Sequence, residues 1–172
     1  MKTFRFFLTG IFLLCCSAMQ AEVIDGINYS LDSSSKTASV TSRTEKYSGD
    51  IVLPETVEYN GVTYSVTSIE YGAFSNSALT SITIPDSVTS IGSGVFSRCT
   101  SLNSIIIPDS VTSIGDCAFD NCASLTSVTM GKGVTTIGED AFSGCTNLLS
   151  ITLGNSIELL SGSWSDLQLR TI

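Results

Sequence analysis

The chain has 172 residues with sixteen acidic and eight basic side chains and no histidine, which gives a formal net charge of −8. This length suits one domain of ordinary size. A surface this acidic repels phosphate backbones and anionic lipid headgroups, so binding to nucleic acid or to a membrane surface is disfavoured. Without histidine the chain lacks the usual general base for a serine or cysteine nucleophile, and we expect no catalytic residue.

Residues 1–21 have the features of a secretory signal peptide. Basic residues at positions 2 and 5 precede an apolar run at 6–16, and small residues that include Ala18 and Ala21 follow. The apolar run is too short to span roughly 30 Å of hydrocarbon as a helix. We therefore predict cleavage within 18–21 and a secreted or cell-surface location. Removal of the leader leaves six cations against sixteen anions.

The segment after the leader is typical of a β-hairpin. Residues 27–31 (INYSL) and 37–41 (TASVT) alternate as strands do, and polar residues at 32–36 separate them. We expect residues 22–48 to form an N-terminal β-hairpin cap that covers the first repeat.

An insertion follows the first repeat-like strand, IVLP at 51–54. In this insertion Asn60-Gly61 lies between Tyr59 and Val62, which predicts a two-residue hairpin turn. Two interpretations stay open: a structural hairpin, or a binding tip that presents Tyr59 and Tyr64.

Internal repetition dominates the rest of the chain. Units of 23 residues open at Leu79, Leu102, Leu125 and Leu148, a phenylalanine recurs late in the units at 96, 119 and 142, and a cysteine follows each at 99, 122 and 145. Short alternating patterns predict two short strands per unit. A glycine recurs after the second strand of each unit, at 92, 115 and 138, and the segment after it has room for a helical turn or two. A single unit cannot bury a core alone, so the units must stack. The predicted fold class is a β-rich solenoid with short parallel strands and short helical turns.

The repeat pattern LxxIxIPxxVxxIGxxAFxxC resembles the BspA-type leucine-rich repeats of bacterial secreted and surface proteins. The resemblance covers about residues 49–160, with departures at Val95 and at 131–133 (GKG). Residues 161–172, with Trp164 near the phenylalanine position, are expected to form an atypical terminal unit or a truncated repeat. The resemblance implies a curved leucine-rich-repeat superhelix, a secreted or cell-surface location, and adhesion to host matrix proteins or other bacteria. It implies no defined catalytic residue.

The cysteines at 99, 122 and 145 occupy the same slot of successive units, and we expect buried free thiols there because cysteine is a small apolar filler. Cys117 interrupts the series, and a bridge between Cys117 and Cys122 is the alternative in an oxidising compartment. We expect no metal site, since there is no histidine and the cysteines lack close paired spacing. The absence of a glycine-rich phosphate loop also predicts no cofactor.

The outward positions of the first strand in each unit are the candidate partner-binding surface. They are Ser81, Thr83, Ser104, Ile106, Ser127, Thr129, Ser150 and Thr152. Ile106 is apolar among hydroxyls and would anchor a partner; the alternative is a polar sheet face without a ligand. We expect a non-catalytic exported repeat protein that mediates protein–protein or cell-surface adhesion through its concave strand face, with extracellular or cell-surface proteins as partners. The alternative is an assembly module that self-associates through an uncapped C-terminal edge.

Overall fold

The structure, a computed structural model, describes residues 20–153 and 158–159, which form fourteen strands and no helix. The strands of the N-terminal part are β1 (Gln20–Ile24), β2 (Ile27–Asp32), β3 (Thr37–Val40), β4 (Ser48–Val52), β5 (Thr56–Tyr59) and β6 (Val62–Ile69). The later ones are β7 (Ala78–Thr83), β8 (Ser90–Ile91), β9 (Ser104–Ile106), β10 (Ser113–Ile114), β11 (Ser127–Thr129), β12 (Thr136–Ile137), β13 (Ser150–Thr152) and β14 (Glu158–Leu159).

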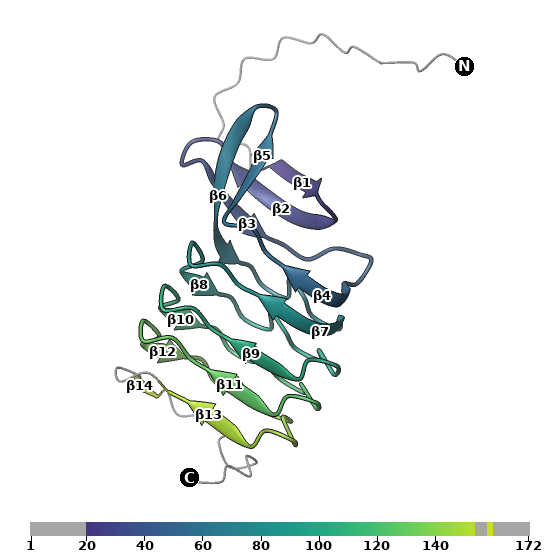
Figure 1. Ribbon diagram of the computed structural model, residues 1–172, viewed down its shortest axis with the longest axis vertical. Coiled ribbons are helices and arrows are strands. Elements are labelled where there is room, and N and C mark those ends of the chain that lie inside the picture. Colours follow the sequence, from purple (N-terminus) through teal and green to yellow (C-terminus); the bar gives the residue numbers. More distant parts are fainter. Residues whose placement is uncertain (1–19, 154–157, 160–172) are drawn as a thin grey trace, which may run out of the picture.

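From β4 onward the chain runs in stacked coils, each coil being one circuit of the chain (Figure 1). One side of the stack carries β4, β7, β9, β11 and β13, and a second side carries β6, β8, β10, β12 and β14. Ser104, Ser127 and Ser150 pair in parallel register, so equivalent strand positions lie 23 residues apart. The offset between β6 and β8 is 22, because Ser68 pairs with Ser90.

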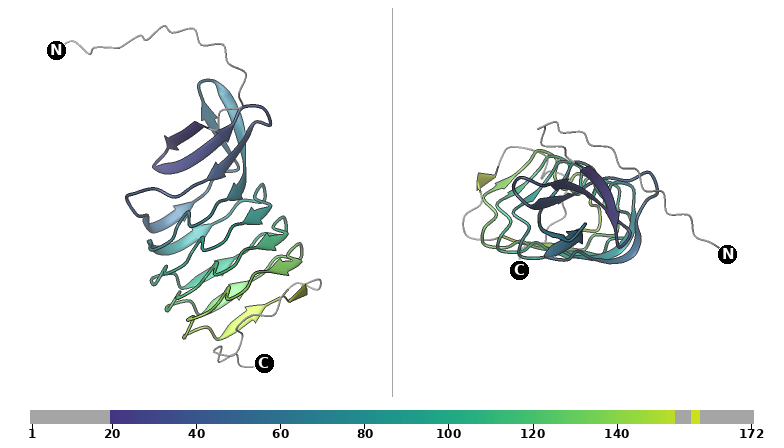
Figure 2. Two further views of the ribbon diagram at one scale, coloured as in Figure 1. Left: turned by 180° about the vertical axis from the view of Figure 1, so that it is seen from behind. Right: turned by 90° about the horizontal axis from the view of Figure 1, so that it is seen from above.

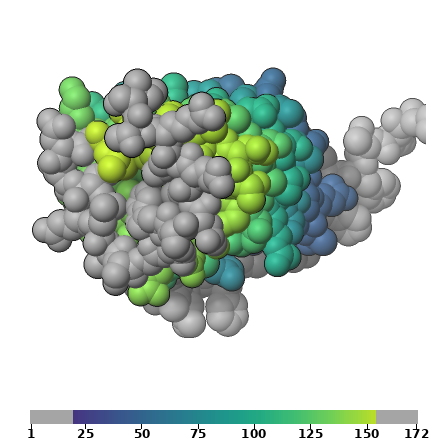
Figure 3. Space-filling model, turned by 90° about the horizontal axis from the view of Figure 1, so that it is seen from below, coloured from purple at the N-terminus to yellow at the C-terminus, as the bar shows by residue number. Residues whose placement is uncertain are grey.

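The outlines of successive coils superpose in the view along the stack (Figure 2, right). Seen from the C-terminal end, the last described coil lies in front of the earlier ones (Figure 3). Residues 161–172, which include Trp164 and for which we predict an atypical terminal unit or a truncated repeat, lie outside the described residues, as does the predicted signal peptide up to residue 19.

The N-terminal part continues the second side of the stack as a cap. β1, β2 and β3 pair antiparallel in that order, and β3 then pairs parallel with β6. The predicted hairpin at Asn60-Gly61 is confirmed: β5 and β6 pair antiparallel, and the two turn residues have φ of 51° and 76°, which glycine and asparagine adopt readily. β1 begins at Gln20, two residues before the expected start of the cap at 22.

The third side of the stack consists of turns where the sequence predicts short helical turns. Left-handed residues recur four positions apart, as at Gly72 (φ 61°) and Asn76 (φ 58°), and they interrupt any right-handed helix. The amides of Gly72, Phe74 and Asn76 also donate to carbonyls of the next coil, to Ser93, Val95 and Ser97 respectively, instead of to their own turn. The helical-turn expectation is therefore not met in the described residues, because left-handed residues interrupt the turn and alternate amides bond to the next coil, while those between them, such as Ala73 and Ser75, donate three residues back.

A column of phenylalanine rings fills the interior. Phe74, Phe96, Phe119 and Phe142 are buried, and their successive ring centroids lie 5.6, 5.2 and 5.1 Å apart with nearly parallel planes. Tyr47 covers the first ring at a centroid distance of 4.9 Å. One continuous apolar interior thus joins neighbouring coils, as obligatory stacking requires.

A ladder of thiols runs beside the rings. Cys99, Cys122 and Cys145 are buried and free, as predicted, and each Sγ donates to the carbonyl of a phenylalanine in the preceding coil at 3.1 Å. Ser77 occupies the equivalent place in the first coil and accepts a hydrogen bond from the amide of Tyr47. The slot therefore selects a small side chain that can also bond to a buried polar group.

Candidate functional site

The strand face consists of the outward positions of β4, β7, β9, β11 and β13. Along β7, Ile82 points into the core while Ser81 and Thr83 point to solvent, as expected from the alternation of a strand. The eight predicted positions all lie on this face: Ser81, Thr83, Ser104, Ile106, Thr129 and Thr152 are exposed, and Ser127 and Ser150 are half-buried.

Two exposed aliphatic side chains interrupt the polar strand face. Ile106 is 69% exposed, and Val52, on β4, is 70% exposed. Val52 pairs with Thr83, while Ile106 pairs with Thr129, so all four occupy one row across the strands. Val52 was not predicted from the sequence, although the match of IVLP to the later strands places it at the position of Ile106.

The serine row beside it is partly occupied by internal hydrogen bonds. The hydroxyls of Thr80 and Ser81 donate to one carboxylate oxygen of Asp50, at 2.6 and 2.7 Å, and these hydrogen bonds lower the pKa of Asp50. The carboxylate therefore stays ionised and fixes the first part of the face. Val52, Thr83 and Ile106, in the neighbouring row, are exposed.

A groove lies at the point where the sheet is interrupted. β4 and β7 form one sheet and β9, β11 and β13 another, so β7 and β9 are neighbours that share no strand ladder. A cavity of about 320 Å³ opens between them, lined by Ser81, Ile82, Thr83, Ile84, Asp86, Ser104, Ile105, Ile106 and Pro108. Ile106 thus stands at the wall of a groove and not on a flat sheet.

The inserted hairpin does not present its tyrosines together. Tyr64 is buried in the core, and the half-buried Tyr59 donates its hydroxyl to Glu22 at 2.7 Å, which ties the hairpin to β1. Tyr64 is therefore unavailable at an exposed tip because its ring packs inward. The geometry is that of a structural hairpin.

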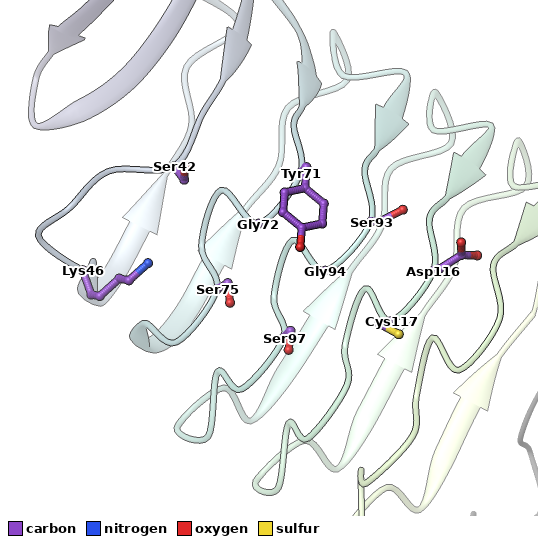
Figure 4. A pocket seen from close by; sticks show the side chains of 10 residues that line it. All are labelled: Ser42, Lys46, Tyr71, Gly72, Ser75, Ser93, Gly94, Ser97, Asp116 and Cys117. Carbon is purple, nitrogen blue, oxygen red and sulfur yellow. The ribbon is translucent and has the colours of Figure 1, made fainter.

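A second cavity, of about 510 Å³, lies on the turn side and was not foreseen from the sequence (Figure 4). Its lining residues are Ser42, Lys46, Tyr71, Gly72, Ser75, Ser93, Gly94, Ser97, Asp116 and Cys117. Tyr71 lies at the centre of this cavity lining, and 78% of its surface is exposed. The sequence signal for Tyr71 is that the later coils carry small or acidic residues at its position.

The cysteine chemistry of the described residues is limited. Burial raises the pKa of the Cys99 thiol to about 11. Cys117 is exposed and free, so the alternative bridge to buried Cys122 is not formed. Partial burial and the nearby charge of Asp120 raise the pKa of the Cys117 thiol.

Residues 20–153 contain no group of three His, Cys, Asp or Glu side chains placed to hold a metal ion. In the same part of the chain there is no helix with the length and apolar character of a membrane span.

Several solved structures share the fold. A leucine-rich repeat protein from Bacteroides ovatus ATCC 8483 is 32% identical with a TM-score of 0.69, over 80% of this chain and 42% of that one. The leucine-rich repeat protein of T. pallidum is 30% identical with a TM-score of 0.68, over 78% and 61%. A leucine rich cell surface protein of Faecalibacterium prausnitzii A2-165 is 30% identical with a TM-score of 0.59, over 81% and 44%. The chain thus spans less than two thirds of these relatives.

Comparison with curated proteins finds no match. The family described as the BspA type leucine rich repeat region matches residues 67–172 in six copies. This match starts later than the resemblance at 49–160 and extends through the tail, where the pattern is weaker. With more than half of its residues matched, the chain belongs to the BspA-type leucine-rich repeat family.

Proposed function

We propose that this protein is a non-catalytic, exported module that binds partner proteins through the strand face. The observation that supports this proposal is the groove between β7 and β9. Ile106 is exposed on the wall of this groove, and Val52 lies in the same row across the strands. An apolar side chain at a groove, surrounded by hydroxyls, resembles the arrangement of a protein interface, which has an apolar centre and a polar rim. Extracellular or cell-surface proteins are the partners, and adhesion is the outcome.

The charge of the chain limits the partner. With a net charge of −8, an approaching protein is favoured when its own surface is basic, because complementary potentials raise the association rate. The polar rim of Ser81, Thr83 and Thr129 supplies donors and acceptors but no cation. We therefore expect the captured proteins to bring their own basic side chains to the edge of the strand face.

Binding to a panel of immobilised matrix proteins tests the proposal, with the purified chain lacking its leader as the analyte. Ile106→Asp places a charge at the groove wall and should weaken binding by about 2 kcal/mol or more, roughly thirtyfold. Thr129→Asp, in the same row, should weaken it less. The matched control is Thr135→Asp, on the second side of the stack, which should leave binding unchanged. Equal binding by the wild type and Ile106→Asp would refute a role for the strand face.

The proposal includes export, and the pairing of β1 with β2 favours one cleavage position for the leader. β1 pairs with β2 from Gln20 onward, with Gln20 opposite Leu31 and Ala21 opposite Ser30. Cleavage after Ala18 keeps all of β1, whereas cleavage after Ala21 removes its first two residues. We infer that the mature chain begins at Met19, and intact-mass measurement of the secreted protein tests this. We also infer that the 23-residue superhelix continues through the tail as an atypical or truncated unit.

Self-association is the second candidate, and one observation favours it. Leu149 and Leu153, at the two ends of β13, are exposed on the last described coil of the first side. Apolar side chains beside a strand edge favour pairing with another chain. Light scattering over a concentration series should show a dimer that Leu149→Glu dissociates; a strict monomer removes this candidate and leaves binding through the strand face intact.

A further inference from the structure

The cavity around Tyr71 departs from the repeat in a way that stacking does not require. Gly72, Gly94 and Cys117 occupy equivalent left-handed positions of successive turns, so Tyr71 corresponds to Ser93 and Asp116 in the next two coils. Serine and aspartate at the same place show that the turn forms without an aromatic ring. With 78% of its surface exposed, Tyr71 adds little to the core.

The neighbouring glycines shape the space beside the ring. A Cβ placed on Gly94 would lie 3.9 Å from Cε2 of Tyr71, so the ring extends over the backbone of the next coil. Gly72 and Gly94 contribute no side chain, and the two together leave an open floor in the cavity of about 510 Å³. This volume falls within the range of roughly 300–1,000 Å³ that small-molecule sites occupy.

The rim of the cavity is polar and carries both donors and acceptors. Four serines, at 42, 75, 93 and 97, surround the ring, with Lys46 at one end and Asp116 at the other (Figure 4). One oxygen of Asp116 accepts the amide of Glu139 at 2.9 Å, and the carboxylate makes no other hydrogen bond within the described residues. Lys46 forms no ion pair within the same part of the chain. Both charged groups are thus available to a ligand.

The site lies where two parts of the fold meet. Ser42 and Lys46 belong to the segment between β3 and β4, which follows the cap, and the other lining residues belong to the first three turns of the stack. Junctions of this kind are common positions for ligand sites. Arg43 joins this segment to the cap, because its guanidinium donates to the carbonyl of Gly26 in the β1–β2 turn and lies 4.0 Å above the centroid of the Tyr47 ring.

We propose that this cavity binds a short neutral saccharide. The C–H face of a sugar ring is apolar and stacks on the negative face of an aromatic ring, while its hydroxyls both donate and accept. Tyr71 supplies the ring face, and the serines, Lys46 and Asp116 supply partners for the hydroxyls. A polyanion is disfavoured by Asp116 and by the net charge of −8, and an apolar ligand is disfavoured because it would bury the serines, Lys46 and Asp116 without partners.

Saturation-transfer NMR with maltose, cellobiose, lactose and N,N′-diacetylchitobiose tests the proposal, on the full mature chain at millimolar sugar. At least one of the four should bind, and Tyr71→Ala should weaken that binding about tenfold, because a ring contact is lost together with its buried area. Tyr71→Phe keeps the ring and should bind within a few fold of the wild type. Since Tyr71 is exposed, the melting temperature of each variant should match the wild type.

A strand-face variant separates this site from the proposed protein-binding function. Ile106→Asp should leave sugar binding unchanged, and Tyr71→Ala should leave capture of matrix proteins unchanged. No binding of any of the four sugars, or binding that survives Tyr71→Ala, overturns the saccharide site. Loss of protein capture in Tyr71→Ala without any sugar binding overturns it as well and assigns Tyr71 to the protein interface.

Discussion

The ring column makes a quantitative prediction about the coupling between coils. Phe119 stacks on Phe96 at 5.2 Å and on Phe142 at 5.1 Å. Phe119→Leu conserves most of the volume, which costs under about 1.5 kcal/mol, but it removes two ring contacts of about 0.5–1.5 kcal/mol each. We therefore expect a loss of about 1–4 kcal/mol in the free energy of unfolding.

A double-mutant cycle isolates the contribution of one stack. Phe96→Leu and Phe119→Leu each remove the contact between the two rings, so the double variant removes that contact once and not twice. It should be about 0.5–1.5 kcal/mol more stable than the sum of the single effects predicts. Urea unfolding followed by circular dichroism measures this, provided that the slope with denaturant stays constant among the variants.

A second pair of rings serves as the control for the cycle. Phe74 and Phe142 are three coils apart and stack on different rings, Phe96 and Phe119 respectively. Phe74→Leu combined with Phe142→Leu should therefore be additive within about 0.5 kcal/mol. If the neighbouring pair were as additive as this distant pair, the rings would stabilise the stack by burial alone and the reasoning from stacking would be refuted.

Four further predictions follow from local geometry. Gly115→Ala should destabilise the fold by about 1–3 kcal/mol, because the added Cβ would lie 2.5 Å from the amide nitrogen of Ser93 in the preceding coil. Arg98→Gly should stabilise it by up to about 1 kcal/mol in thermal melts, since Arg98 has φ of 60°. Hydrogen bonds from Ser34 and Ser35 hold the pKa of Asp32 at about 2, so stability should fall as the pH drops from about 4 to 2, and Ser34→Ala should raise that pKa in an NMR titration. Alkylation of the native protein should modify Cys117 before the other thiols of residues 20–153, as mass spectrometry will show.

The two substitutions have control variants, and the other two predictions have outcomes that would contradict them. Ser93→Ala, in the coil that Gly115 approaches, should change stability little. Thr100→Gly lies outside the left-handed positions and should destabilise, in contrast to Arg98→Gly. Because folding lowers the pKa of Asp32, its ionised carboxylate stabilises the fold at pH values above the unfolded pKa of about 3.9. A loss of stability that began only at alkaline pH would contradict this assignment. Alkylation of Cys122 as fast as Cys117 would contradict the burial of the thiol ladder.

The sequence predicted the stacked architecture because the repeat encodes it redundantly. Each unit places leucine, phenylalanine and cysteine at the same positions, so a pattern read in one unit is checked by the next. The turn side was predicted less well. A short segment between strands fits a helical turn by length, and the left-handed residues at Gly72, Asn76, Gly94 and Arg98 become apparent only when the amides are seen bonding to the next coil.

The two candidate surfaces also differ in how far they could be predicted from the sequence. The strand face was predictable, since alternation fixes which residues of a strand point outward, and Ile106 was visible as the exception. Three features depend on packing between segments and were not predictable: the burial of Tyr64, the break between β7 and β9, and the cavity beside Tyr71. The cavity needs the segment between β3 and β4 together with three turns of the stack, and no single stretch of sequence shows that they meet.

Binding in such a stack is expected where the repeat is broken. Positions that recur in every coil are fixed by the needs of stacking, as the buried rings and the thiol ladder show. Ile106 stands where the neighbouring units carry threonine, and Tyr71 stands where they carry serine and aspartate, so neither is required by the fold. Both lie beside a cavity, and both are largely exposed. Replacing either with the residue of the neighbouring unit, Ile106→Thr or Tyr71→Ser, should therefore leave stability within about 0.5 kcal/mol while it removes the binding assigned to that surface.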